Sequence, residues 1–442
     1  MSASPALQSF DRIWEAHSAR AARSPSPMQA FRRRAMAQFN RLGMPTLRDE
    51  SWHYTNLRLL AQRAFAETPA AADPAIDAAA DLSWLLPGED CTRLMQINGI
   101  PLPPAADHLP AGITVTTLRE MERSDPQALA SLMLPLSEAE HERWVLLNSA
   151  LFEDGLHIRV SGRCAPPLLI LHVSAADAAQ QIFNPRIIIE AAPGSRALII
   201  EHHVSGNANG IFSNSVCSID LSENAELEHF RVFSGNTAAT HMDHLHVRAG
   251  RNAKLREHTV CLDGAFVRAN LDANLAAADA ALEAFTLLTG HDARHTDCVN
   301  IVTHAAPHTR SRQTARAIAS GRSRAVFNSK VIVNAGAQKA DSHQSCRGLL
   351  LSPTAEIDTR PQLEINANDV KCAHGATTGR LDPDMLFYLL SRGLDRGTAQ
   401  SLLVFAFLAD VLTGMSLPAV RNGIESKLIE QLPDSQLLRQ FR

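Results

Sequence analysis

The chain has 442 residues, of which 45% are hydrophobic and 20% are charged, and its formal net charge is -4. This length exceeds the size at which one compact core stops growing, so we expect two or three structural units. The near balance of acidic and basic residues argues against binding to nucleic acid or to an anionic membrane surface. Because there is no secretory segment and no apolar run of roughly 18 residues, the sequence predicts a soluble protein of the reducing cytoplasm.

The N-terminal part of the chain is predicted to be mainly helical. Residues 5–42 have a helical pattern that is broken at Ser24-Pro25-Ser26-Pro27, because prolines disfavour the helical conformation at the residues before them. The alanine-rich stretch 67–80 is typical of a linker. We predict a first domain, helical and mixed, over residues 1–150.

The middle of the chain has the texture of strands. Between about residues 155 and 370, short β-branched and apolar runs are separated by Gly, Asn, Asp and Ser. Turn-then-strand phrases recur there, and their marker leucines lie about 28 residues apart; these are Leu198, Leu227, Leu255 and Leu282. A repeat of this length predicts a solenoid whose stacked coils share one core. A sandwich or jelly roll also has many short strands but no reason to keep a fixed repeat. We predict a parallel β-helix over residues 151–380.

The last part of the chain, residues 381–442, is predicted to be a helical domain. Asp382 followed by Pro383 is typical of a helix start, since proline lacks the N–H group that would be unpaired there, and Gly393 is typical of a helix end. Apolar residues dominate the second predicted helix, 398–414. This helix either covers the solenoid or offers a docking surface to a partner, and the sequence leaves both interpretations open.

Seven cysteines are spread along the chain, and no two are closer than about 25 residues. This spacing is typical of free thiols and not of a disulfide framework. It also excludes a CxxC zinc or ferredoxin-type motif, so any metal must be gathered from distant segments or from a second chain. The sequence has no Gly-Lys pair and therefore no phosphate-binding P-loop, and no Gly-rich dinucleotide motif follows a predicted strand.

Cys372 and His374 form the first candidate site. On a strand, side chains two residues apart point to the same face, so this thiol and this imidazole can bind one metal ion together. Both groups are suitable ligands for iron or zinc. Taken alone the pattern is weak, because a buried thiol near a core histidine is a common structural feature.

Two other patterns are weaker candidates. His244 and His246 form a His-x-His pair, which begins the metal motif of cupins, but the glutamate expected about four or five residues later is absent. The run Ser342-His343-Gln344-Ser345-Cys346-Arg347 contains nucleophile and base types close together, yet such groups normally come from separate segments. We interpret this run as a strand and turn.

The C-terminal candidate segment carries a family resemblance. Residues 361–394, PQLEINANDVKCAHGATTGRLDPDMLFYLLSRGL, closely resemble the C-terminal signature of the SufB/SufD family of iron-sulfur cluster assembly proteins, in its SufD branch. Weaker similarity extends over most of the chain and includes DESWHYTNL, INGIPL and LNSALFEDGLHIRV. The SufB branch typically bears a cysteine-rich motif in its N-terminal part, whereas the first hundred residues here contain only Cys91.

The resemblance implies a right-handed parallel β-helix between helical domains, in a non-catalytic scaffold subunit of the Suf machinery. It implies pairing with SufB through the β-helix and with the ATPase SufC through the C-terminal helices, 398–432, and a homodimer is a further expectation for the isolated chain. His374 and Cys372 match positions at the SufB–SufD interface, where a transient iron-sulfur cluster is thought to form between a SufB cysteine and the SufD histidine. We therefore expect His374 to be a cluster ligand with Cys372 in support, and we expect this chain to bind no nucleotide.

Two enzymatic alternatives stay open. Carbohydrate-active lyases and hydrolases with a β-helix carry paired acids in a surface groove, although such enzymes usually act outside the cell. A cupin-like metalloenzyme would hold a stoichiometric metal ion at His244 and His246. Clustered carboxylates in a groove would favour the first alternative, and a metal ion at the two histidines would favour the second.

Overall fold

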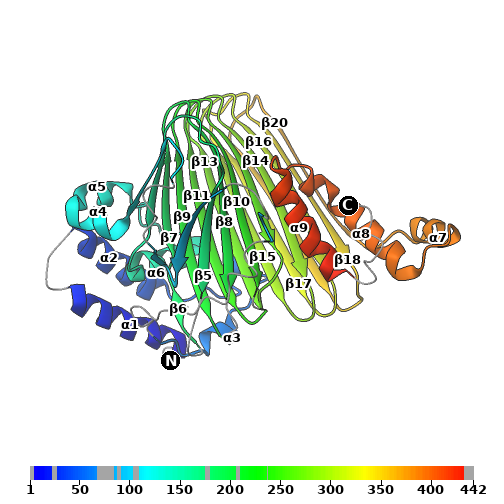
Figure 1. Ribbon diagram of the computed structural model, residues 1–442, viewed down its shortest axis with the longest axis horizontal. Helices are drawn as coiled ribbons and strands as arrows, with labels where there is room; N and C mark the ends of the chain where they lie inside the picture. The colour runs from blue at the N-terminus through cyan, green and yellow to red at the C-terminus, as the bar shows by residue number, and fades with distance from the viewer. Residues whose placement is uncertain are drawn as a thin grey trace.

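The computed structural model describes residues 4–21, 27–66, 84–86, 91–102, 109–174, 180–205, 210–235 and 237–432. These residues form a solenoid of mainly parallel β-strands with helices at both ends (Figure 1). This architecture confirms the predicted parallel β-helix and excludes the sandwich and the jelly roll. The predicted linker at 67–80 lies outside the described residues.

The N-terminal part contributes helices at one end of the solenoid. Helices α1 (Pro5–Ala21) and α2 (Pro27–Leu42) lie on either side of the predicted proline-rich break. Thr117 begins α4 by accepting a hydrogen bond from the backbone N–H of Glu120, and Asp125 begins α5 in the same way. After α2, the helical segments of this part are, in chain order, η1 (Glu50–Trp52), α3 (Arg58–Ala61), α4 (Leu118–Ser124), α5 (Pro126–Leu132), η4 (Glu140–Glu142) and α6 (Arg143–Leu151).

Two ten-stranded sheets face each other across the core of the described chain. Neighbouring strands are parallel, except for the antiparallel pairs β1–β2 and β3–β4. The first sheet consists, in spatial order, of β2 (Ile100–Pro101), β1 (Thr92–Ile97), β5 (Leu168–Ser174), β8 (Arg196–Ser205), β10 (Glu226–Gly235), β12 (Lys254–Cys261), β14 (Ala281–Gly290), β16 (Arg310–Ala319), β18 (Asp341–Leu350) and β20 (Lys371–Gly379). The second consists of β19 (Glu356–Ile365), β17 (Arg324–Val333), β15 (His295–His304), β13 (Phe266–Leu275), β11 (Thr240–Ala249), β9 (Phe212–Leu221), β7 (Arg186–Ala191), β4 (Leu156–Val160) and β3 (Ile113–Thr117), with β6 (Ile182–Phe183) beside β9.

Rows of mainly apolar side chains, one from each coil, fill the inside of the solenoid. Leu227 lies directly beside Leu255, and Leu255 lies beside Leu282, so these marker leucines stack in register. All three are buried in one cluster to which both sheets contribute. The first marker is an exception, because Ala197 occupies this row and Leu198 points to the outer face. A single coil cannot bury such a row, so the core forms only when coils stack.

The turns between coils need a left-handed backbone conformation at one residue. Asn224, Asn252 and Asp279 have φ angles of 60°, 51° and 64°, and Asn and Asp tolerate this region better than most residues with a side chain. The asparagines also form a ladder, in which Nδ2 of Asn252 donates a hydrogen bond to Oδ1 of Asn224 at 2.7 Å. The phrases that indicated a repeat in the sequence are therefore the turns that end each coil.

The N-terminal segment covers the outer face of the second sheet. Trp144 packs edge-on against Phe212 of β9, with ring centroids 5.3 Å apart, inside a buried cluster. The guanidinium of Arg268, on β13, lies over the Trp52 ring at 3.6 Å from its centroid and forms an ion pair with Asp297. Cation–π contact and charge pairing thus hold the aromatic segment around Trp52 on the solenoid.

The C-terminal helices cover the outer face of the first sheet. Helices α8 (Arg396–Leu412) and α9 (Pro418–Gln431) lie across its strands in Figure 1. Leu408 and Val411 of α8 are buried in the same cluster as Val260 of β12. The apolar helix predicted from the sequence is therefore a lid on the sheet, which was one of the two interpretations left open.

The short helix α7 (Pro383–Ser391) has no buried residue and projects from the body of the protein (Figure 1). The domain limits drawn at residues 150 and 380 stay predictions. Strands β1 and β3, which precede residue 150, already belong to the sheets of the solenoid. The N-terminal part therefore contributes strands to the β-helix as well as helices beside it.

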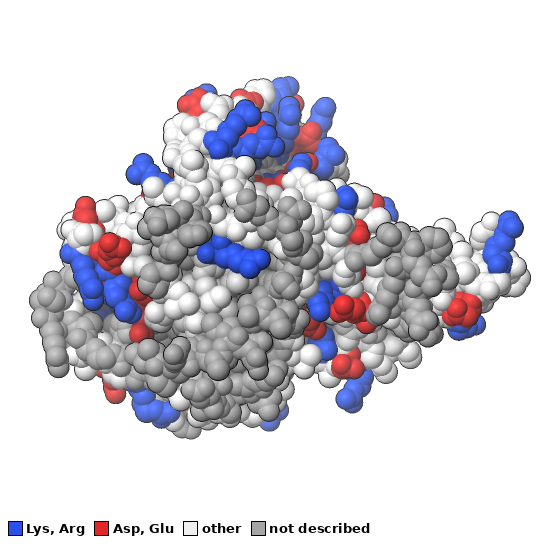
Figure 2. Space-filling model, viewed as in Figure 1, with Lys and Arg blue, Asp and Glu red and all other residues white. Residues whose placement is uncertain are grey.

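The surface carries charges of both signs. On the face shown in Figure 2, Lys and Arg side chains are interspersed with Asp and Glu. Such mixing agrees with the small net charge and gives no single-sign surface on that face. Among the helices of the described chain, none is both long and apolar enough to cross a lipid bilayer.

We predict that Asn252→Val lowers the melting temperature of the protein more than Asn252→Gly does. A β-branched side chain in the left-handed region costs roughly 1–2 kcal/mol, whereas glycine adopts it freely, and both variants lose the same ladder hydrogen bond. Thermal unfolding followed by circular dichroism measures the difference. Equal melting temperatures for the two variants would contradict the role of the left-handed turn.

Candidate functional site

The last coil of the solenoid is open. Strands β19 and β20 lie at the edges of the two sheets, and no other strand of the described chain pairs with their outer sides. Their backbone N–H and C=O groups on those sides are therefore available to another molecule. Nearly all side chains of β20 are exposed, whereas those of the central strand β10 are mostly buried.

Cys372 and His374 both lie on this open coil, in strand β20. Cys372 is directly beside Ser342, and His374 is directly beside Gln344, on the neighbouring strand β18. Ser342 and Gln344 are 0% and 4% exposed, but His374 is exposed because no coil follows β20. The structure thus places the two predicted ligands on one inward-facing side of the strand, at the end of the solenoid.

These two side chains can offer one sulfur and one nitrogen ligand. Cys372 is half-buried against the core, and burial raises the pKa of its thiol, so a metal must displace the thiol proton in order to bind. Among the described residues no third His, Cys, Asp or Glu joins them in a group with metal-ligand spacing. Any further ligands at this end of the solenoid have to come from outside the described residues.

Helix α7 follows β20 and displays apolar side chains to solvent. Met385, Phe387 and Tyr388 are 58%, 70% and 56% exposed. Exposed apolar groups gathered on one short helix are typical of a docking surface. The helix for which the sequence left a docking role open is the next one, α8, and it packs on the first sheet. The sequence signal for a docking surface on α7 is its run of apolar residues. In a helix of nine residues this run leaves no polar face that could point to solvent.

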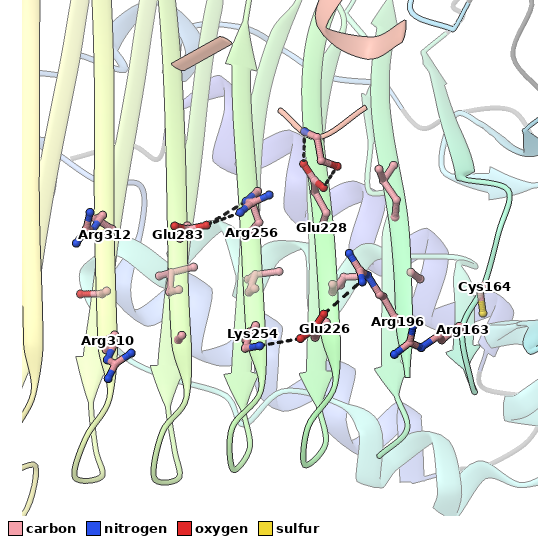
Figure 3. Close-up of a pocket in the computed structure, with 18 of the residues that line it drawn as sticks. Arg163, Cys164, Arg196, Glu226, Glu228, Lys254, Arg256, Glu283, Arg310 and Arg312 are labelled. Carbon is pink, nitrogen blue, oxygen red and sulfur yellow. Dashed lines mark hydrogen bonds and ion pairs between the residues drawn. The ribbon is translucent and has the colours of Figure 1, made fainter. Parts of the chain in front are cut away.

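A groove lies on the outer face of the first sheet, beside the loop between α8 and α9 (Figure 3). Charged side chains of opposite sign alternate along it: Lys254 contacts Glu226 at 2.8 Å, and Arg256 contacts Glu283 at 2.8 Å. Each of these carboxylates therefore has a cationic partner from a neighbouring coil. This arrangement differs from the free pair of acids that glycoside chemistry uses, so the groove gives no support to the carbohydrate-active alternative.

The two weaker sequence patterns have different outcomes. Ser342 and Cys346 are buried and face the core, whereas His343 points to the opposite, outer face. Neighbouring side chains on a strand alternate between faces, so this run forms no nucleophile–base pair. His244 and His246 do share a face, the outer side of β11, and their ring centroids are 6.5 Å apart.

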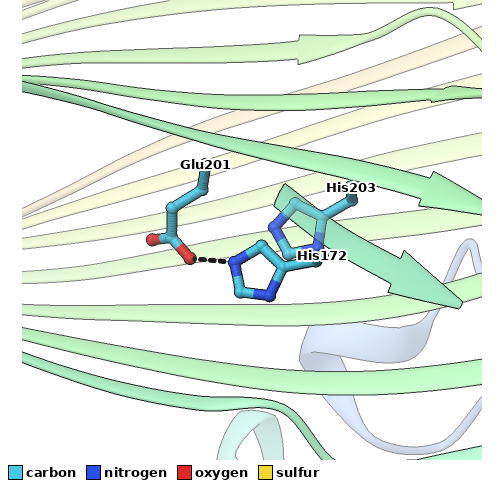
Figure 4. A group of neighbouring side chains, drawn as sticks. All are labelled: His172, Glu201 and His203. Atoms are coloured by element: carbon cyan, nitrogen blue, oxygen red, sulfur yellow. Dashed lines mark hydrogen bonds and ion pairs between the residues drawn. The ribbon is translucent and has the colours of Figure 1, made fainter. Parts of the chain in front are cut away.

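A buried network of polar side chains inside the solenoid was missed by sequence analysis. Nε2 of His172 lies 2.8 Å from one carboxylate oxygen of Glu201 (Figure 4). The other oxygen of Glu201 lies 2.9 Å from Nε2 of His229, and Nδ1 of His229 lies 2.7 Å from Glu257. The ring of His203 stacks on that of His172, with centroids 4.3 Å apart. All five side chains are buried.

Arg231 and Asp243 extend this network to the second sheet. Nε of Arg231 donates a hydrogen bond to Glu257 at 2.8 Å, and its Nη1 donates one to Asp243 at 2.6 Å. Alternation along the strand is the signal that could have found the network, since His229 and Arg231 are two residues apart and share the inward face. Polar residues at inward positions of an apolar strand must find partners in neighbouring coils.

Hydrogen bonding decides which of these groups are charged. Burial alone would raise the pKa of Glu201, but hydrogen bonds from His172 and His229 hold it well below its ordinary value. Burial alone would lower the pKa of His229, but the carboxylates of Glu257 and Glu201 raise it to about 9. At neutral pH the core therefore contains an imidazolium between two carboxylates. Removing one partner of such a set leaves a buried charge without compensation.

We predict that His229→Gln destabilises the protein most at low pH. Because the pKa of His229 rises from 6.5 to about 9 on folding, its stabilisation is fully present below pH 6.5 and is lost as the pH rises through 9. The shift corresponds to a stabilisation on the order of 3 kcal/mol. Melting temperatures of both proteins between about pH 6 and pH 10 measure the effect. A difference that stays constant over this range would rule out the charged histidine.

Comparison with known proteins gives two matching family models. The one described as "SUF system FeS cluster assembly, SufBD core domain" matches residues 172–407, and the one described as "SufBD protein N-terminal region" matches residues 6–165. The iron-sulfur cluster assembly protein SufD of Escherichia coli K12 is 29% identical over 434 residues, which cover 97% of each chain. A SufBD family iron-sulfur cluster assembly protein of Synechocystis is 29% identical over 397 residues, or 87% of this chain and 86% of the relative.

A chloroplast protein of Arabidopsis thaliana, ABCI7, is 30% identical over 233 residues, or 52% of this chain and 49% of the relative. The core-domain model alone spans more than half of the chain, and its limits enclose the strands from β6 to β20. The parallel β-helix with its open last coil is thus the scaffold to which this similarity applies, and the chain belongs to the SufBD family of iron-sulfur cluster assembly proteins.

Proposed function

We propose that this chain is a non-catalytic scaffold subunit of the Suf machinery, in which it pairs with SufB through the open end of its β-helix and works in the cytoplasm. Family membership and the name of the E. coli relative support a role in iron-sulfur cluster assembly. The observation that carries the proposal is the position of His374, which is exposed on the last strand of its sheet. The seven free cysteines suit a reducing compartment.

The open edges of β19 and β20 suit a partner with a similar fold. An edge strand binds a strand of another chain through the same backbone hydrogen bonds that pair strands within a sheet. A second β-helix placed end to end would continue both sheets and cover the exposed Ile365. A second copy of this chain can use the same edges, which supports the homodimer expected for the isolated chain.

We propose that His374 is a ligand of the nascent cluster at this interface, with Cys372 as a supporting ligand. A site shared by two chains needs only one or two ligands from each, which agrees with the wide spacing of the cysteines. A neutral imidazole in place of one thiolate reduces the negative charge around the cluster and makes the site more labile. A labile site is suitable for a cluster that is assembled at this interface and then transferred to another protein.

Nucleotide hydrolysis belongs to another subunit in this proposal, because the sequence has no P-loop. The ATPase SufC is the proposed partner of the C-terminal helical part. The exposed apolar side chains of α7 support a contact there, whereas the apolar sides of α8 and α9 are occupied by the first sheet. We therefore place the centre of the proposed SufC contact on α7 and not within residues 398–432.

We predict that His374→Ala abolishes cluster assembly in vivo while SufB and SufC still co-purify with the chain. The imidazole is exposed and contributes to no core, so its removal takes away a ligand without weakening the fold. Maturation of an iron-sulfur enzyme in cells that depend on the Suf proteins is the measurement. His343→Ala is a matched control, since His343 is an exposed histidine on the outer face of the adjacent strand. Normal maturation with His374→Ala would falsify the ligand role.

We predict that Phe387→Asp reduces co-purification of SufC at least about tenfold and leaves the melting temperature unchanged. A charge in the middle of an apolar contact removes a buried anchor, and such anchors each contribute about 2 kcal/mol or more. Leu59→Asp is the control, because Leu59 is a 75% exposed apolar residue on α3. Undiminished SufC binding by Phe387→Asp would place the contact elsewhere.

A further inference from the structure

A second group of ligand-type side chains lies on the outer face of the second sheet. His141 and Glu142 belong to η4, and Asp272 belongs to β13. Nε2 of His141 lies 3.7 Å from a carboxylate oxygen of Glu142 and 3.6 Å from one of Asp272. One ligand atom of each residue lies within 4.8 Å of the other two. We call these three side chains the η4 cluster.

The distances within the η4 cluster are not those of hydrogen bonds. An N–H···O bond has a donor–acceptor distance of about 2.7–3.2 Å, and Nε2 of His141 has no hydrogen-bond partner although it is shielded from solvent. A tetrahedral ion with bonds of about 2.0–2.1 Å holds its ligand atoms about 3.4 Å apart. The separations from Nε2 to both carboxylates are therefore closer to the spacing around a metal ion than to that of a hydrogen-bonded ion pair.

His246 lies next to the η4 cluster but is not among the three side chains whose ligand atoms lie within 4.8 Å of one another. It lies directly opposite Asp272, on the neighbouring strand β11 and on the same outer face. Its Nε2 is shielded from solvent and has no hydrogen-bond partner, and it is close enough to His141 for an electrostatic interaction. The His-x-His pattern of the sequence thus has one carboxylate beside it, that of Asp272. It comes from the neighbouring strand β13 and not from the same strand.

Neighbouring contacts fix the segment that supplies His141 and Glu142. Just before them, the carboxylate of Glu140 accepts a hydrogen bond from the backbone N–H of Ser51 at 2.6 Å. Just after them, Arg143 forms a bidentate ion pair with Asp49. Ligands that are held in place before the ion arrives lose little freedom when they bind it.

We propose that the η4 cluster binds a divalent transition-metal ion such as Zn²⁺ and thereby holds η4 on the β-helix. One imidazole and two carboxylates suit Zn²⁺ or Fe²⁺ better than Ca²⁺ or Mg²⁺, which prefer oxygen ligands alone. The side chains of His141, Glu142 and Asp272 are 18%, 13% and 31% exposed, so an ion can enter from solvent. The site shares no residue with the proposed cluster ligands, and it holds or fails independently of the proposed function.

The test is a titration of the full-length protein with Co²⁺, whose visible absorption reports the number and geometry of its ligands, and with Zn²⁺ by calorimetry. All proteins carry Cys372→Ser and His374→Ala, so that the open end of the solenoid contributes no ligand. We expect one ion per chain, a melting temperature that rises with Zn²⁺, and at least about tenfold weaker binding in Asp272→Asn and His141→Ala.

Asp341→Asn is the matched control, since Asp341 and His343 form an exposed contact of the same type at 3.3 Å. It is expected to bind Co²⁺ as tightly as its parent. Failure of the parent to bind one ion, or unchanged affinity in Asp272→Asn, overturns the proposal. If circular dichroism shows that Asp272→Asn does not fold, Glu142→Gln is the deciding variant, and the proposal then requires at least about tenfold weaker Co²⁺ binding in Glu142→Gln.

Discussion

Each coil of this β-helix buries its apolar row against the coils on either side, so the register between strands decides which residues are covered and which are not. Leu227, Leu255 and Leu282 are buried because each has a neighbour in the row on both sides. The same rule leaves the last coil with one side unpaired. His374 is exposed for this reason alone, since Gln344, which precedes it in the row, is buried. The geometry that makes the core thus also makes the open end.

Polar side chains on the inward rows depend on the same register, and each of them also needs a hydrogen-bonding partner in a neighbouring coil. A buried Glu201 needs partners that donate hydrogen bonds, and His172 and His229 supply them from the coils before and after. Charged groups are costly in a core unless every one of them is paired. The network therefore fixes the relative positions of several coils, because a slip of one residue would turn the carboxylate and its partners to opposite faces.

Much of the fold could be predicted from the sequence because its repeat is local. The turn residues Asn224 and Asn252 recur at a fixed spacing, and the strand alternation puts Cys372 and His374 on one face. The first marker, Leu198, lies one position away from the buried row, because its coil is longer than the next and places Ala197 in that row. What could not be predicted depends on contacts between distant segments. Nothing near residues 244–246 indicates that Asp272 of β13 lies beside them. The exposure of α7 likewise depends on how the other C-terminal helices pack on the first sheet.

The segment around Trp52 also has a consequence for how the chain reaches its final form. Glu50 forms an ion pair with Arg360 of β19, a residue 310 positions later in the sequence. During synthesis on the ribosome, this N-terminal residue has no β19 to contact until nearly the whole β-helix has emerged. Until then the Trp52 segment cannot complete its docking, although its contact with Arg268 is available earlier. The contact between Glu50 and Arg360 is therefore among the last that the N-terminal part of the chain can make.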